Sequence, residues 1–128
     1  MREISYQLES AKSFDEIAHL LEKVAPEHSF RVLAIHDTQA TLAEKGFKIE
    51  PLKIFEVCNS SFAYKALNKD INVSLFMPCK IVVRSESGKT AISLAKPSMI
   101  AAMLPDSGLE ELSLEAEKQL IEIIESIK

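Results

Sequence analysis

The chain has 128 residues, of which 47% are hydrophobic and 27% are charged. This length supports one hydrophobic core and is too short for two, so we expect a single domain over residues 1–128. The composition excludes a wholly disordered protein, and the net charge of −4 argues against a general nucleic-acid-binding protein. No stretch approaches the ~20 apolar residues that cross a bilayer, and the start lacks the apolar run of a signal peptide. We therefore predict a cytoplasmic protein with no nucleic-acid partner and no membrane partner.

The beginning of the chain predicts a strand and then a helix. Polar and apolar residues alternate over residues 3–9, which is typical of a strand with one buried face. The next segment has apolar side chains at helical spacing, and Ser13 with Glu16 matches a capping box at its start. We expect this helix to end near Pro26, because proline cannot donate the next helical hydrogen bond.

Residues 30–37 carry apolar side chains on both faces, which predicts a strand in the interior of the sheet. Asp37 or Thr38 can cap a short helix that runs to Lys45. Gly46 suits the left-handed conformation that ends such a helix.

The middle of the chain predicts a strand over residues 52–58, followed by a helix that Asn59 or Ser60 can cap. Two further extended runs are predicted at residues 71–77 and 80–86, with Pro78 between them.

The last third of the chain predicts a hairpin and a long helix. Gly88 lies in the turn at residues 85–89, and residues 90–95 form the returning strand. An apolar segment at 96–106 then precedes a helix with a long apolar stripe. Together the elements predict an α+β fold, in which a curved, mainly antiparallel sheet has helices packed on one face and a long carboxy-terminal helix.

Four short motifs carry a resemblance to a known family. They are Asp37 before a short helix, Cys58-Asn59 before a helix, Pro78-Cys79 at the start of a strand, and Gly88-Lys89-Thr90 after a turn. In their order and spacing the chain resembles the bacterial and archaeal family called domain of unknown function 302. The resemblance implies a helix-grip or TATA-binding-protein-like fold and a homodimer, and the family name assigns no activity. Proline usually follows Cys-Asn in this family, whereas here Ser60 stands there.

The two cysteines raise a chemical question. Cys58 comes just before a predicted helix, whose positive amino-terminal end would lower the pKa of the thiol. If their strands are neighbours, Cys58 and Cys79 lie at one end of the sheet, as a reactive thiolate and its resolving partner would. Their spacing matches neither C-x-x-C nor a zinc motif, so we predict no metal site. Free cysteines are also common core residues, and we favour that role.

The candidate binding residues also include His36, Asp37, Asn59 and Lys80. His36 and Asp37 are adjacent in a strand and therefore point to opposite faces, which argues against a catalytic pair. The basic residues of the late strands could attract an anion, although alternating Lys and Glu also keeps a sheet face soluble. These basic residues are Lys80, Arg84, Lys89 and Lys96.

The chain contains no Ser-His-acid order, phosphate-binding glycine loop or paired-carboxylate motif. We predict a non-catalytic ligand-binding or accessory protein that acts as a homodimer, with a small-molecule pocket between the carboxy-terminal helix and the sheet. One alternative is a thiol-dependent redox or sulfur-transfer protein that uses Cys58 and Cys79. The other is a purely structural module that dimerises through the segment containing Met99 and Met103, which could instead be a pocket lid. The sequence identifies no cofactor.

Overall fold

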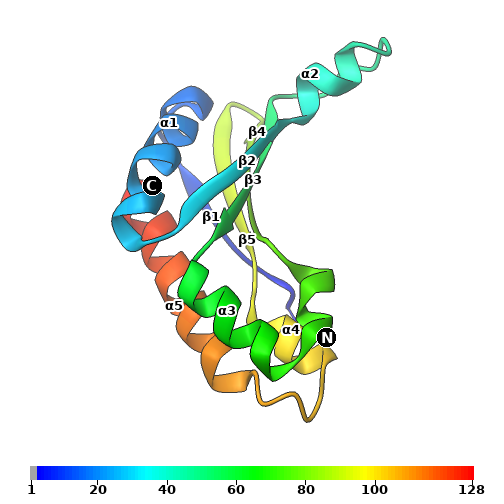
Figure 1. Ribbon diagram of the computed structural model, residues 1–128. Helices are drawn as coiled ribbons and strands as arrows, with labels where there is room; N and C mark the ends of the chain where they lie inside the picture. Colours follow the sequence, from blue (N-terminus) through cyan, green and yellow to red (C-terminus); the bar gives the residue numbers. More distant parts are fainter. Residues whose placement is uncertain (1–2) are drawn as a thin grey trace.

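A computed structural model describes residues 3–128 (Figure 1). Five strands form one open, antiparallel sheet in the order β1-β5-β4-β3-β2. The strands are β1 (Ser5–Ser10), β2 (Arg31–Asp37), β3 (Leu52–Cys58), β4 (Cys79–Glu86) and β5 (Lys89–Ala95). The predicted α+β architecture is confirmed.

Five α-helices and two 3-10 helices accompany the sheet. They are α1 (Phe14–Val24), η1 (Ala25–His28), α2 (Thr38–Ala43), α3 (Ser60–Lys69), η2 (Ile71–Phe76), α4 (Ser98–Met103) and α5 (Glu110–Ile127). The long helix α5 and α1 lie together against one face of the sheet (Figure 1). α3, α4 and the first turns of α5 gather beyond one end of the strands, whereas α2 projects away from the molecule at the other end (Figure 1).

The helix starts follow the predicted caps. Ser13 Oγ accepts a hydrogen bond from the Glu16 N–H at 3.1 Å, Asp37 Oδ1 from the Ala40 N–H at 2.9 Å, and Asn59 Oδ1 from the Phe62 N–H at 3.1 Å. Each side chain satisfies one of the N–H groups that the first turn leaves unpaired, which contributes about 1 kcal/mol. These three caps fix the starts of the helices that follow β1, β2 and β3.

The prediction that residues 30–37 form an interior strand is wrong. β2 is an edge strand, with Leu33 51% exposed and Ile35 36% exposed. A bulge between Val32 and Ala34 shifts the register against β3. Because a bulge changes which face the following side chains occupy, the apolar residues lie on both faces without either face being buried.

Residues 71–77 were predicted to be extended, and this is also wrong, because Ile71–Phe76 forms the 3-10 helix η2. Asp70 Oδ1 accepts a hydrogen bond from the Asn72 N–H at 2.9 Å and caps this short helix. Val73 is the buried residue of η2, at 4% exposure. The local cap and a single inward side chain therefore outweigh the β propensity of the segment.

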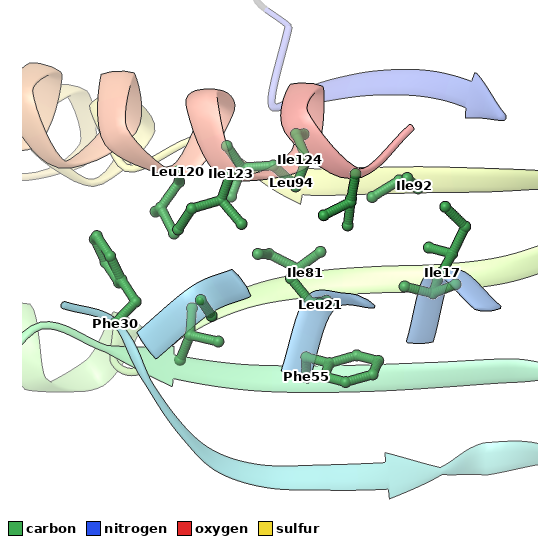
Figure 2. Packing of buried hydrophobic residues seen from close by; sticks show 14 of the residues in the cluster. Ile17, Leu21, Phe30, Phe55, Ile81, Ile92, Leu94, Leu120, Ile123 and Ile124 are labelled. Atoms are coloured by element: carbon green, nitrogen blue, oxygen red, sulfur yellow. The ribbon is translucent and has the colours of Figure 1, made fainter. Parts of the chain in front are cut away.

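The main core lies between α5, α1 and the sheet. Leu120, Ile123 and Ile124 of α5 are fully buried, and Figure 2 shows them directed toward strand residues such as Leu94 and Ile81. Burying a side chain of this size contributes about 1.5–3 kcal/mol. The interface between the carboxy-terminal half of α5 and the sheet is therefore filled by side chains.

We expect Leu120→Ala to lower the free energy of unfolding by about 2–5 kcal/mol, because it removes fully buried atoms and leaves a cavity. Leu114→Ala is the matched control, since Leu114 lies on the same helix and is 56% exposed. That change should alter stability by no more than about 0.5 kcal/mol. Urea unfolding followed by circular dichroism measures both, and equal losses in the two variants would contradict this account of the core.

Candidate functional site

A hollow lies beyond the end of the sheet, where β3 ends and β4 begins. Its walls come from α3, η2, α4 and the first turns of α5, and we call it the terminal pocket. Its cavity volume is about 70 Å³. It separates the main core from a smaller apolar cluster built on Val73, Ala101 and Leu109.

Apolar side chains form almost the whole wall of the terminal pocket. The rings of Phe30 and Phe62 lie 6.3 Å apart and are tilted by 35°. Ile100 of α4 contributes another part of the wall, and Leu112 and Ala116 of α5 contribute a third. Among residues 3–128, no charged side chain lines it.

The location of the pocket differs from the predicted one. The sequence suggests a hollow between the carboxy-terminal helix and the sheet, but Leu120 and Ile124 are fully buried there. Only the first turns of α5, up to Ala116, and the preceding residue Leu109 border the terminal pocket. The reason is that this part of α5 contacts α3 and α4 beyond the strands.

Both cysteines and Asn59 line the terminal pocket. Val57 of β3 is paired with Cys79 of β4, so Cys58 is offset by one residue from the other cysteine. Both thiols are free. The structure thus brings Cys79 to the same pocket as the adjacent residues Cys58 and Asn59, because β3 and β4 are neighbours.

Burial raises the pKa of both thiols. The pKa of Cys79 is raised from 9.0 to about 11, mainly by burial and further by the nearby Cys58, while Lys80 opposes the shift. Burial also raises the pKa of Cys58. The prediction that the helix start lowers the pKa of Cys58 is therefore wrong, because the loss of hydration outweighs the helix dipole. Both groups are neutral thiols near neutral pH.

Two further polar side chains line the terminal pocket. Asn59 Oδ1 accepts a hydrogen bond from the Phe62 N–H. The Ser113 hydroxyl donates a hydrogen bond to the carbonyl oxygen of Glu110 at 3.0 Å. Within the described chain, Asn59 Nδ2 donates to no protein group, and every buried side-chain nitrogen and oxygen has a partner. Asn59 Nδ2 is therefore an unused donor that solvent or a ligand can reach.

The other predicted binding residues lie outside the terminal pocket. His36 Nε2 is 3.1 Å from Glu56 Oε1, and Lys80 Nζ is 3.9 Å from Glu56 Oε2. Asp37 caps α2 and is paired with Lys53, at the opposite end of β3 from Cys58. The structure thus joins His36 and Lys80 through a glutamate and gives Asp37 a role in helix capping.

The basic residues of the late strands each lie beside a glutamate. The nitrogen-to-oxygen distances are 3.9 Å for Lys80–Glu56, 2.7 Å for Arg84–Glu86, 3.5 Å for Lys89–Glu9 and 4.0 Å for Lys96–Glu3. Because opposite charges alternate along these strands, the four cations do not form an uncompensated patch for an anion.

Most of the apolar wall was not predictable from the sequence. Phe62, Met77 and Leu112 were not candidates for a site, although the helical stripe that contains Leu112 was visible. The apolar segment at 96–106 was proposed as a lid or a dimer contact, and its Pro97 and Ile100 do line the terminal pocket. Hydrophobic spacing identifies inward-facing positions, but it does not distinguish a packed position from one beside a hollow.

Within residues 3–128, no three His, Cys, Asp or Glu side chains are placed to hold a metal ion. No helix in the described part of the chain is both long and apolar enough to cross a lipid bilayer.

Comparison with known proteins identifies relatives of this chain. Residues 6–127 match the sequence profile described as "Domain of unknown function DUF302". The crystal structure of an uncharacterized conserved protein DUF302 from Bacillus stearothermophilus is similar over 99% of this chain and 100% of that chain, with 32% sequence identity and a TM-score of 0.94. No curated protein matches the chain.

We expect the protein to lose stability as the pH rises from 9 to 11, because the unfolded chain releases the Cys79 proton near 9.0 and the folded protein only near 11. The folded state holds more protons in this window, so each unit of pH increase lowers the free energy of unfolding. A pKa shift of two units corresponds to a total loss of about 3 kcal/mol. Urea unfolding at a series of pH values measures the slope. Cys79→Ala should make the slope shallower, while the raised pKa of Cys58 leaves part of it, and a slope that the substitution leaves unchanged would contradict the raised pKa of Cys79.

Proposed function

The chain belongs to the DUF302 family, whose description assigns no activity, and we propose that it is a non-catalytic protein that binds a small apolar molecule in the terminal pocket and acts as a homodimer. The observation that supports the ligand class is the wall of the pocket, in which apolar side chains from four helical segments surround two half-buried thiols. With a cavity volume of about 70 Å³, the hollow lies below the usual size of small-molecule sites, about 300–1,000 Å³, so we propose a compact apolar molecule as its ligand.

The chemistry of the wall supports binding rather than catalysis. Acid–base and nucleophilic catalysis need groups whose pKa values suit the working pH. The titratable side chains on this wall are Cys58 and Cys79, and the pKa values of both are raised. A wall without a thiolate, carboxylate or imidazole is suited to holding a molecule unchanged.

The size and polarity of the pocket also favour an apolar occupant over water. A buried water needs about 10–15 Å³ of space for its centre and two to four polar partners. The terminal pocket offers about 70 Å³, so it has room for several waters, but few polar atoms to hold them. Apolar cavities of this kind stay dry or take up apolar molecules, because a ligand gains dispersion contacts there without displacing well-held water.

We expect Ala63→Phe to weaken binding of a neutral hydrophobic fluorescent probe by about tenfold or more, because the added ring occupies the hollow that Ala63 lines. Ala102→Phe is the matched control, since Ala102 is exposed on α4. Fluorescence titration of the purified protein measures the affinity, and native mass spectra show whether a copurified ligand disappears in the same variant. Unchanged binding in a folded Ala63→Phe protein would contradict the site.

Exposed apolar side chains support the homodimer. Leu33 and Ile35 lie on the edge strand β2, and Phe47 and Ile49 follow α2 on the projecting arm (Figure 1). Phe47 is 63% exposed. Unpaired sheet edges and grouped apolar side chains are typical of surfaces that pair with another chain, and a second copy is the occupant we propose.

We expect the double variant Ile35→Lys, Phe47→Ser to shift the protein from dimer to monomer, because it places a charge on the sheet edge and removes an exposed ring from the arm. Met103→Ser serves as the control, since Met103 is 57% exposed in the segment 96–106. Sedimentation velocity measures the oligomeric state. Dissociation by Met103→Ser alone would move the interface to α4, and a monomeric wild type would contradict the dimer.

The thiol-dependent function remains a second candidate, because Cys58 and Cys79 line the same hollow. This function would need one thiol to ionise near neutral pH. Burial works against that ionisation at both positions. In this alternative Cys58 is the reactive thiolate and Cys79 its resolving partner. Alkylation of Cys58 followed by mass spectrometry tests it, since rapid labelling at neutral pH would support the alternative and labelling only at alkaline pH would exclude it.

A further inference from the structure

One element in the wall of the terminal pocket is held more weakly than its neighbours, namely the short helix α4. We infer that α4 is a movable wall, that the Glu117 carboxylate is the latch that holds it against α5, and that an apolar ligand larger than the resting cavity binds with α4 displaced. The inference rests on the proposed binding function, because it names the conformational change by which the same pocket takes up its ligand.

The first observation is the size of the resting cavity. Its volume is about 70 Å³, roughly half of the ~150 Å³ of an apolar protein cavity that binds benzene. Protein interiors are close-packed, so the side chains around a hollow yield little unless the element that carries them shifts. A ligand of more than a few non-hydrogen atoms therefore needs one element of the wall to move.

The second observation is how little of α4 is buried. Pro97 and Ile100 line the terminal pocket, and Ala101 is the buried residue of the helix, at 5% exposure. Ala101 belongs to the smaller cluster with Val73 and Leu109, and within residues 3–128 no side chain of α4 takes part in the main core. α3 and α5, by contrast, place side chains in or against the main core. Of these three helices, α4 therefore costs the least hydrophobic free energy to displace.

The third observation is the hydrogen bonding at the start of α4. α1 and α3 each begin with a local side-chain cap, whereas Pro97 at the start of α4 provides none. Instead, Glu117 Oε1 of α5 accepts hydrogen bonds from the Ser98 N–H at 3.1 Å and from the Ser98 hydroxyl at 2.6 Å. Hydrogen bonds to a charged group are stronger than those between neutral groups. Because this cap comes from another helix, α4 loses it when it moves away from α5.

The two ends of the segment show where α4 turns. The Lys96 N–H donates a hydrogen bond to the Ile4 carbonyl oxygen at 2.9 Å, which ties the chain to β1 just before Pro97. On the other side, Asp106 and Gly108 have φ angles of 65° and 77° in the connection to α5. Hinges consist of a few loop or element-terminal residues of this kind, which absorb changes in backbone angle. α4 thus lies between a fixed strand end and a turn that serves as its hinge.

The test compares Glu117→Ala with Glu122→Ala, which makes the same change at an exposed position of α5. Hydrogen–deuterium exchange read by mass spectrometry measures the protection of the α4 amides without a ligand. Two neutral probes of different size then report on the pocket, namely xenon by protein-observed NMR and the much larger N-phenyl-1-naphthylamine by fluorescence titration. Glu117→Gln is the conservative variant, since it keeps an acceptor oxygen, and thermal unfolding verifies that each variant is folded.

We expect Glu117→Ala to lower the protection of the α4 amides about tenfold, the effect of losing hydrogen bonds to a charged group. The same variant should bind N-phenyl-1-naphthylamine about tenfold more tightly, because this probe no longer has to break the latch. Xenon binding should stay within about twofold of wild type, since a single atom needs no displacement of α4. Glu122→Ala should change none of these quantities, and Glu117→Gln should have smaller effects than Glu117→Ala.

Other outcomes separate this inference from the proposed function. If Glu117→Ala leaves the protection of α4 unchanged, or if it weakens or strengthens binding of both probes alike, α4 is not a latched wall, while binding by the wild-type protein still supports the apolar site. Damage to the pocket itself would weaken both probes, which is opposite in sign to the expected effect on the larger one. If neither probe binds the wild-type protein, both the inference and the proposed function are overturned.

Discussion

The structure depends on the burial of one face of α5, and this helix extends past the sheet that it covers. Leu120, Ile123 and Ile124 pack against the strands, whereas Leu109 belongs to a second cluster with Val73 and Ala101. Each cluster packs against its own part of α5. The side chains of neither cluster fill the space between the two. The terminal pocket lies at this boundary, between Phe30 of the main core and Ile100 on the side of the second cluster. The hollow is therefore a consequence of a helix that serves two cores.

The apolar character of the pocket and the state of its thiols have the same cause. Removing a thiolate from water costs free energy that neither the start of α3 nor Lys80 recovers, so Cys58 and Cys79 stay protonated. In this state cysteine behaves as a small apolar side chain. Two cysteines that suggest redox chemistry in the sequence thus act as part of an apolar wall. The side chains of His36, Glu56 and Lys80 instead meet outside the pocket, where those of His36 and Lys80 are about half exposed.

The predictable parts of the fold are those that local chemistry determines. Ser13, Asp37 and Asn59 mark helix starts because each side chain bonds a backbone group only three residues away. The position of β2 at the sheet edge and its bulge depend on strand order, which periodicity does not reveal. Part of the site was predicted for the same local reason, since Cys58 and Asn59 lie at a strand-to-helix junction. The part of the wall that α4 and α5 contribute could not be predicted, because it depends on how distant helices pack.

Asn59 connects the fold to the site, because one residue both caps a helix and lines the pocket. Its Oδ1 accepts a hydrogen bond from the Phe62 N–H and starts α3, the helix that carries Phe62 and Ala63 into the wall. A helix start that a side-chain hydrogen bond defines holds the residues of the first turn in one arrangement. The shape of this part of the wall therefore depends on the same local chemistry that determines where β3 ends.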